Sequence, residues 1–196
     1  MHNEKKEFII AITGASGTIY AFRLLQILTE MPNKAIINLL ISNAALSIID
    51  NELESSLKKK LNEIIKHKSI IQYSNDDFTA PFASGNSSPN AMIVVPCSMK
   101  TLAGIASGFS NNLILRAADV MLKERKKLIL VPRETPLNLI HLQNMVKATK
   151  AGAIILPAMP AFYFKPISIQ NLVDFIIAKI LSQLEINHSI IKKWAK

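Results

Sequence analysis

The sequence has 196 residues, a length that suits one domain and is too short for two of ordinary size. Its side chains are 49% hydrophobic and 19% charged, a composition that can bury one apolar core. The net charge of +9 is typical of proteins that bind nucleic acid. Aromatic residues are only 6%, however, and no nucleic-acid-binding signature accompanies the lysines, so we expect no nucleic-acid partner. The longest apolar runs fall far short of the roughly 20 residues of a membrane helix, which argues against a membrane protein.

Apolar runs alternate with amphipathic segments along the chain. Continuous apolar runs predict buried strands at 8–12, 35–41, 91–95, 128–131 and 153–156. Helical spacing predicts helices at 18–30, 53–68, 100–106, 111–124, 139–150 and 168–184, and Ser42-Asn43 is a further helix N-cap signal. This order predicts an α/β fold with a parallel sheet covered by helices on both faces, in a single domain of residues 1–196 with a tail at about 185–196.

Four loops follow predicted strands and should meet at one edge of this sheet, where such folds bind ligands. They are 13–17, 96–98, 132–134 and 157–163. The first is a glycine turn before a helix, which favours a phosphate or another anion, although the same turn also suits close packing of strand and helix.

The loops argue against several cofactors. The dinucleotide motif Gly-x-Gly-x-x-Gly and the Walker lysine are absent, and Ser42 stands where an NAD site would have Asp or Glu. Ser42, Ser98 and Thr101 either hydrogen-bond a ligand or cap helices. Four scattered histidines predict no metal site, and Ser16 has no evident histidine partner for a hydrolase triad.

Charged residues and the lone cysteine complete the candidate set. Arg116 lies in an apolar helical stretch and needs a partner, either Asp119 or an anionic ligand. Lys123, Arg133 and Glu134 lie near a strand end, although each alone is more often part of a surface salt bridge. Cys97 is the only cysteine, which excludes an intrachain disulfide, and its place between strand and helix favours a buried side chain over a nucleophile. Residues 1–7 carry no signal-peptide cleavage pattern, so we expect a cytoplasmic protein.

Taken together, these segments resemble the UbiX family of flavin prenyltransferases. The resemblance covers nearly the whole chain and runs in order through 13–17, 83–92, 96–98, 111–120, 122–125, 130–134, 141–145 and 173–175.

The resemblance implies a flavodoxin-like Rossmann domain that binds FMN, usually in a homododecamer. It implies transfer of a dimethylallyl group from dimethylallyl phosphate or diphosphate to N5 and C6 of reduced FMN, making prenylated FMN for UbiD-type decarboxylases. The residues implied to contact FMN are Gly14, Ala15, Ser16, Ser42, Ser98, Thr101 and Arg116. Those implied to hold the donor phosphate are Lys123, Arg133, Tyr163 and Lys179, and those at the reacting centre are Ser16, Glu134 and Trp194.

One residue departs from the family pattern, and two other functions stay open. Lys179 stands where the family commonly has arginine, which keeps the charge but loses the planar fork. A flavin-dependent cysteine decarboxylase would share the fold and FMN, but it typically has an active-site histidine early in the chain, and none lies between His2 and His67. A non-catalytic FMN carrier would not need a second site for an anion.

Overall fold

A six-stranded sheet organises the molecule, in a computed structural model that describes residues 6–31, 35–87 and 89–191. All its pairings are parallel, in the order β3-β2-β1-β4-β5-β6, which confirms the predicted parallel α/β sheet. The strands are β1 (Glu7–Ile12), β2 (Ile36–Ile41), β3 (Ile70–Tyr73), β4 (Ala91–Cys97), β5 (Lys127–Pro132) and β6 (Ile154–Ile155). The edge strand β3 was not predicted, because its side chains are half-buried or exposed and give no continuous apolar run.

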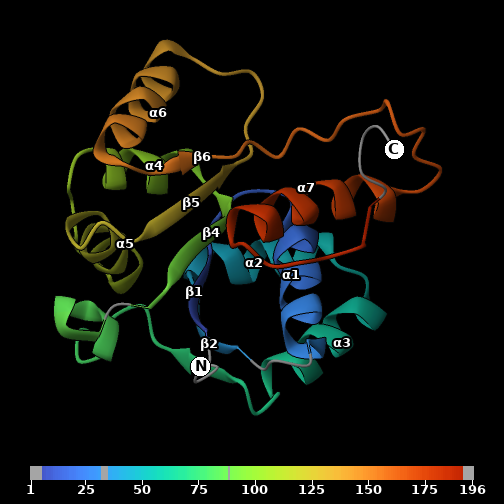
Figure 1. Ribbon diagram of the computed structural model, residues 1–196, viewed down its shortest axis with the longest axis horizontal. Helices are drawn as coiled ribbons and strands as arrows, with labels where there is room; N and C mark the ends of the chain where they lie inside the picture. The colour runs from blue at the N-terminus through green and yellow to red at the C-terminus, as the bar shows by residue number, and fades with distance from the viewer. Residues whose placement is uncertain (1–5, 32–34, 88, 192–196) are drawn as a thin grey trace.

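Helices cover both faces of the sheet (Figure 1). They are α1 (Thr18–Glu30), α2 (Asn43–Glu52), α3 (Ser55–Ile65), α4 (Met99–Ala106), α5 (Leu113–Lys123), α6 (Leu139–Ala151) and α7 (Ile169–Gln183), with short 3-10 turns at Pro81–Ala83 and Gly85–Ser87. Helices α1, α2, α3 and α7 lie on one side, and α4, α5 and α6 on the other. The predicted helix at 53–68 is shorter than expected, and the N-cap signal at Ser42 begins a full helix, α2.

Alternate side chains of the central strands enter two apolar clusters, one on each face. Ile10 and Ile12 of β1 pack with α1 and α7, whereas Ile9 and Ala11 pack with α4 and α5. Because both faces are buried, β4 is apolar throughout and β1 is apolar from Phe8 to Ile12, as the sequence indicates. Within the described ranges, no helix combines the length and apolarity needed to cross a bilayer.

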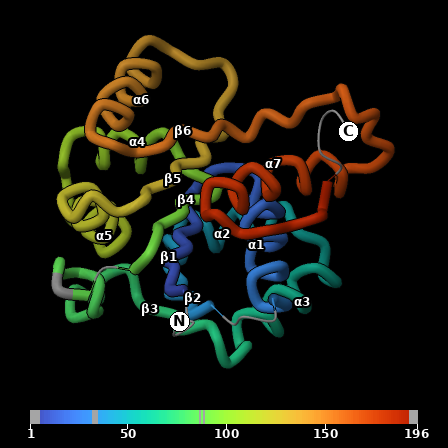
Figure 2. The backbone as a smooth tube through the Cα atoms, viewed as in Figure 1, coloured from blue at the N-terminus to red at the C-terminus, as the bar shows by residue number. Residues whose placement is uncertain are grey.

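The strand order reverses between β1 and β4, which are neighbours in the sheet. In open parallel sheets this reversal opens a crevice at the carboxyl ends of the two strands. The loops after β1, β4, β5 and β6 all leave from that edge, as predicted. The chain after β6 then runs outward as a long extended segment and returns into α7 (Figure 2).

Candidate active site

A cavity of about 390 Å³ lies at the carboxyl ends of β1 and β4. Its lining residues come from the loops after β1, β4 and β5, from α2 and from the first residue of α4. They are Gly14, Ala15, Ser16, Ile48, Asn51, Glu52, Ser98, Met99, Arg133 and Glu134. Three of the four predicted loops therefore meet at one cavity, whereas the loop at 157–163 does not line it.

Thr13 holds the two central loops together. Its buried hydroxyl donates to the carbonyl of Pro96 at 2.8 Å and accepts from the amide of Ser98 at 2.8 Å. The next residue must be glycine for the loop to lie where it does, since a Cβ on Gly14 would come within 2.6 Å of the Cβ of Ala44. The Thr13 hydroxyl and the close approach of Gly14 to Ala44 thus fix the loops before α1, α2 and α4 relative to one another.

Glu52 occupies the N-terminus of α1, the position where the glycine turn predicts an anion. Its carboxylate accepts from the amides of Gly17 and Thr18, each at 3.0 Å, and from the Thr18 hydroxyl at 2.9 Å. The positive end of the helix dipole and unpaired amides favour a negative group at such a position. The sequence analysis missed Glu52, because it comes from the end of a helix that was not predicted in full.

The protonation of Glu52 follows from these contacts. Partial burial of the carboxylate acts to raise its pKa, but hydrogen bonds from Ser16, Thr18 and Gly17 outweigh it and hold the pKa below its ordinary value. Glu52 is therefore ionised at neutral pH, and the cavity wall bears a negative charge beside the Ser16 hydroxyl.

Arg133 and Glu134 supply the charges of the opposite wall. Arg133 donates from Nε to the carbonyl of Ser16 at 3.2 Å, and within the described ranges it forms no ion pair. Glu134 accepts from the backbone amide of Thr135 at 3.0 Å through one carboxylate oxygen. A guanidinium without a carboxylate partner is suited to bind an anionic group in this cavity.

The hydroxyls of Ser42 and Ser98 cap helices, and Thr101 is bonded to the Ser98 cap. Ser42 accepts from the amide of Ala45 at 3.2 Å and caps α2, and Ser98 accepts from the amide of Thr101 at 3.2 Å and caps α4. Ser98 also donates to the Thr101 hydroxyl at 3.0 Å. Ser98 lines the cavity, whereas Ser42 and Thr101 do not.

Arg116 and Lys123 lie outside this cavity, on α5. Arg116 donates to the carbonyl of Ala83 at 2.9 Å and pairs with Asp119 at 3.1 Å, one of the two kinds of partner that the sequence left open. Lys123 is the last residue of α5 and precedes β5, which puts it at the amino edge of the sheet, opposite the cavity. One chain alone does not bring these two cations to the cavity.

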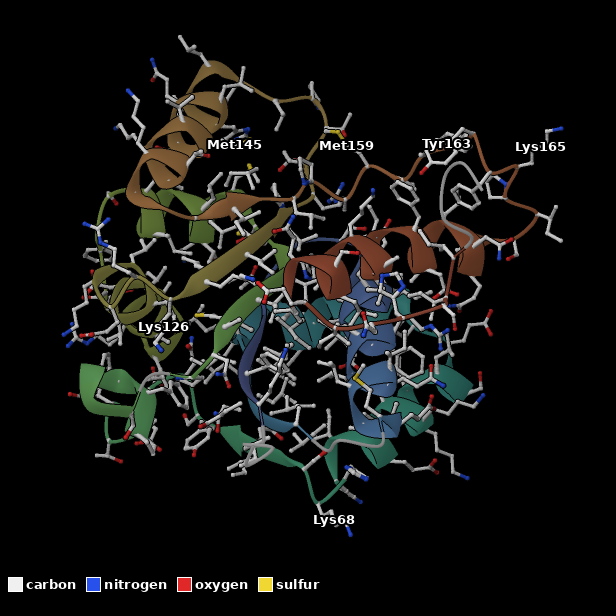
Figure 3. All side chains as sticks on the ribbon, in the orientation of Figure 1. Lys68, Lys126, Met145, Met159, Tyr163 and Lys165 are labelled. Carbon is white, nitrogen blue, oxygen red and sulfur yellow. The ribbon has the colours of Figure 1, made fainter. Side chains whose placement is uncertain are left out.

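Tyr163, in the segment before α7, and Lys179, on α7, both lie near the Phe175 ring, and neither lines the cavity. The Lys179 ammonium lies 5.4 Å from the centre of the Phe175 ring, and the Tyr163 ring packs edge-on against Phe175 at 6.0 Å. Figure 3 shows Tyr163 in the extended segment above α7. Two of the four residues that the resemblance assigns to the donor phosphate therefore pack against the same aromatic ring, Phe175. Trp194, assigned to the reacting centre, lies outside the described residues.

Cys97 is inert, as the sequence favours. It is fully buried, and that burial raises its thiol pKa to about 12, so it does not ionise at neutral pH. Among the residues that the structure describes, no three His, Cys, Asp or Glu side chains gather in a way that would hold a metal ion.

Comparison with known proteins gives the class of this fold and site. Residues 1–194 match the family model described as Flavoprotein. A flavin prenyltransferase UbiX from Methanocaldococcus jannaschii is 48% identical over 188 residues, which cover 96% of this chain and 98% of the relative.

Two solved structures superpose over nearly the full length. A dodecameric FMN-dependent UbiX-like decarboxylase from Escherichia coli O157:H7 has a TM-score of 0.89 and 39% identity, covering 97% of this chain and 100% of its own. AnUbiX (PadA1), in complex with FMN and dimethylallyl pyrophosphate, has a TM-score of 0.87 and 38% identity, covering 98% of this chain and 99% of its own.

The match to the family model makes this protein a flavoprotein. At 48% identity over nearly both full lengths, the chain belongs to the UbiX family of flavin prenyltransferases.

Proposed function

We propose that this protein joins the dimethylallyl group of dimethylallyl phosphate or diphosphate to N5 and C6 of reduced FMN. The observation that carries the proposal is the cavity at the β1 and β4 ends, in a chain 48% identical to a flavin prenyltransferase. The product, prenylated FMN, would serve a UbiD-type decarboxylase. We infer a cytoplasmic location, since the donor, the flavin and the product are small charged molecules.

The residues around the cavity fit FMN. The backbone of Gly14 and Ala15 and the hydroxyls of Ser16 and Ser98 offer hydrogen-bond partners for a flavin ring and its polar chain, and Met99 adds an apolar contact. The hydroxyls of Ser42 and Thr101 are proposed as further FMN ligands. Reduced FMN would supply the nucleophilic ring atoms that form bonds to the prenyl group.

The chain's own charged groups would promote departure of the donor phosphate. Breaking the allylic carbon–oxygen bond leaves negative charge on the phosphate and positive charge on the dimethylallyl group, and a preorganised cation stabilises the former. We assign this role to Arg133, together with Tyr163 and Lys179. We assign proton transfer to Glu134, which lines the cavity together with Ser16 and follows Arg133, whose Nε donates to the Ser16 carbonyl. We keep Trp194 as a proposed support for the allylic cation.

Arg116 and Lys123 would reach a cavity only across a contact between copies. The E. coli relative is dodecameric, and this chain places both cations outside its own cavity. We therefore propose a homododecamer in which the α5 cations of one copy complete the site of another.

The test is to incubate the purified chain anaerobically with reduced FMN and either dimethylallyl phosphate or the diphosphate, and to measure the flavin by mass spectrometry. A prenyl adduct is expected with at least one donor. Binding of FMN without an adduct from either donor would overturn the proposal and favour an FMN carrier. In a separate assay with oxidised FMN and a peptide that ends in cysteine, release of carbon dioxide with reduction of the flavin would favour the decarboxylase alternative.

Two variants test the assigned roles. Glu134→Gln should lower the turnover number by about 10²–10⁴-fold, the usual range for loss of a general acid or base, and unchanged turnover would remove that role. Lys179→Ala should raise the KM for the donor while FMN binding stays the same. An unaltered donor KM would show that Lys179 does not bind the phosphate.

A further inference from the structure

Helix α6 turns its apolar side away from its own chain. Among its residues Ala148 is fully buried, and Met145 packs partly against the core on the same side of the helix, toward α4 (Figure 3). By contrast, Leu139 is 68% exposed, Val146 53% and Leu142 47%. A surface helix ordinarily has the opposite arrangement, with its apolar stripe against the core.

The exposed residues form a continuous stripe. Leu139, Leu142 and Val146 follow one another at intervals of three and four residues, which puts them on one side of a helix, opposite Ala148. With Gln143, Lys147 and Lys150 they line a groove of about 480 Å³. This spacing is the one by which helices pack against one another, with apolar residues in the seam and charged residues beside it.

We propose that this α6 stripe, defined by Leu139, Leu142 and Val146, is a contact surface for a second copy of this chain. The inference rests on the dodecameric assembly proposed above. It specifies the surface that assembly would bury: an apolar centre with Lys147 and Lys150 at its margin, the composition of a protein–protein interface. Exposed apolar groups of this kind in a free chain mark an interaction site.

The stripe is also linked to the candidate active site through the chain. Asn138 caps α6 by accepting from the amide of His141 at 2.9 Å, and the loop before it carries Arg133 and Glu134. A neighbour packed on the stripe would hold the start of α6 in place and thereby hold this loop. The contact would therefore order one wall of the cavity.

The experiment measures the mass of the full chain in solution, without flavin or donor, by light scattering after size-exclusion chromatography. The wild type should have a mass several times the 21.7 kDa of one chain. Leu142→Glu/Val146→Glu should lower that mass at least about twofold, because loss of one contact releases smaller units of a closed assembly. The control Ser55→Glu/Ser56→Glu adds the same charge at the exposed start of α3 and should keep the wild-type mass.

Two results would overturn the proposal: a wild type of single-chain mass, or a double variant that keeps the wild-type mass. Circular dichroism checks that each variant is folded, as expected because both replaced side chains are exposed in the single chain. If the double variant unfolds, the milder Val146→Ser replaces it. Its mass should fall as the protein is diluted, over a concentration range in which the mass of the wild type stays constant, and a constant mass for Val146→Ser would overturn the proposal. Because no flavin or donor is present, the outcome is independent of whether the protein transfers a prenyl group.

Discussion

Replacing Thr13 by valine tests whether its hydroxyl holds the cavity floor together. Valine has the same shape but loses the bond to the Pro96 carbonyl and leaves the Ser98 amide without its acceptor, both at 2.8 Å in the native chain. Each lost bond costs about 1 kcal/mol, and an unpaired amide adds about 1 kcal/mol or more. We therefore expect Thr13→Val to lower the free energy of unfolding by about 2–3 kcal/mol.

Urea unfolding followed by circular dichroism measures this change, with all proteins at the same concentration because assembly affects stability. The melting temperature should fall by about 5–10 °C for a chain of this length. Thr29→Val is the matched control: its hydroxyl donates to the carbonyl of Leu25 at 2.9 Å within α1, and we expect a change of about 0.5 kcal/mol or less. Equal effects of the two substitutions would refute the bridging role of Thr13.

Three further substitutions test other contacts by the same unfolding assay. Glu52→Gln should destabilise the fold at pH 7. The folded-state pKa of Glu52 is lowered, so its ionised form contributes stability that is lost as the pH falls through that pKa. The difference in unfolding free energy between wild type and Glu52→Gln should therefore shrink toward pH 3.5, which is below the ordinary glutamate pKa of about 4.3. Gly14→Ala should cost about 1–3 kcal/mol through the close approach to Ala44, and a second change, Ala44→Gly, should recover part of it. Asp174→Asn should cost about 2–3 kcal/mol, since it leaves Arg23, paired at 2.7 Å, largely buried without its carboxylate.

Each of these expectations has a result that contradicts it. The Glu52 expectation is wrong if the stability difference between Glu52→Gln and wild type stays constant across the pH range. It is also wrong if Glu54→Gln has the same effect, because Glu54 makes no side-chain capping bond. For Gly14, the contradicting result is a double variant no more stable than Gly14→Ala. For Asp174, it is an additive double-mutant cycle with Arg23→Gln, which would show that the two side chains do not interact.

The fold could be predicted from the sequence wherever a strand is buried on both faces. Strands β1 and β4 have nearly every side chain buried, so they stand out as apolar runs. The edge strand β3 has no such run, and its pairing with β2 depends on long-range contacts that local patterns do not contain. The two-residue β6 is shorter than the apolar run at 153–156, because only part of that run pairs with β5.

The site was predictable to the extent that it follows from strand order. Loops after parallel strands share one edge, which explains why Ser16, Ser98 and Arg133 meet. Glu52 was not predictable, since it reaches α1 from the end of another helix through tertiary packing. Lys123 carried a usable signal: it precedes β5 whereas Arg133 follows it, so the two lie at opposite edges of the sheet.

The central place of β1 in the sheet affects how the chain folds during synthesis. The partner of β1 on one side, β2, begins at Ile36, but its partner on the other side, β4, begins only at Ala91, about 80 residues after β1 ends. At about 5–20 residues per second, translation of that stretch takes roughly 4–16 s. During that time an apolar strand has an unpaired edge, the feature by which nascent chains aggregate. Production of this protein in cells should therefore depend on chaperones that bind the nascent chain before β4 is made.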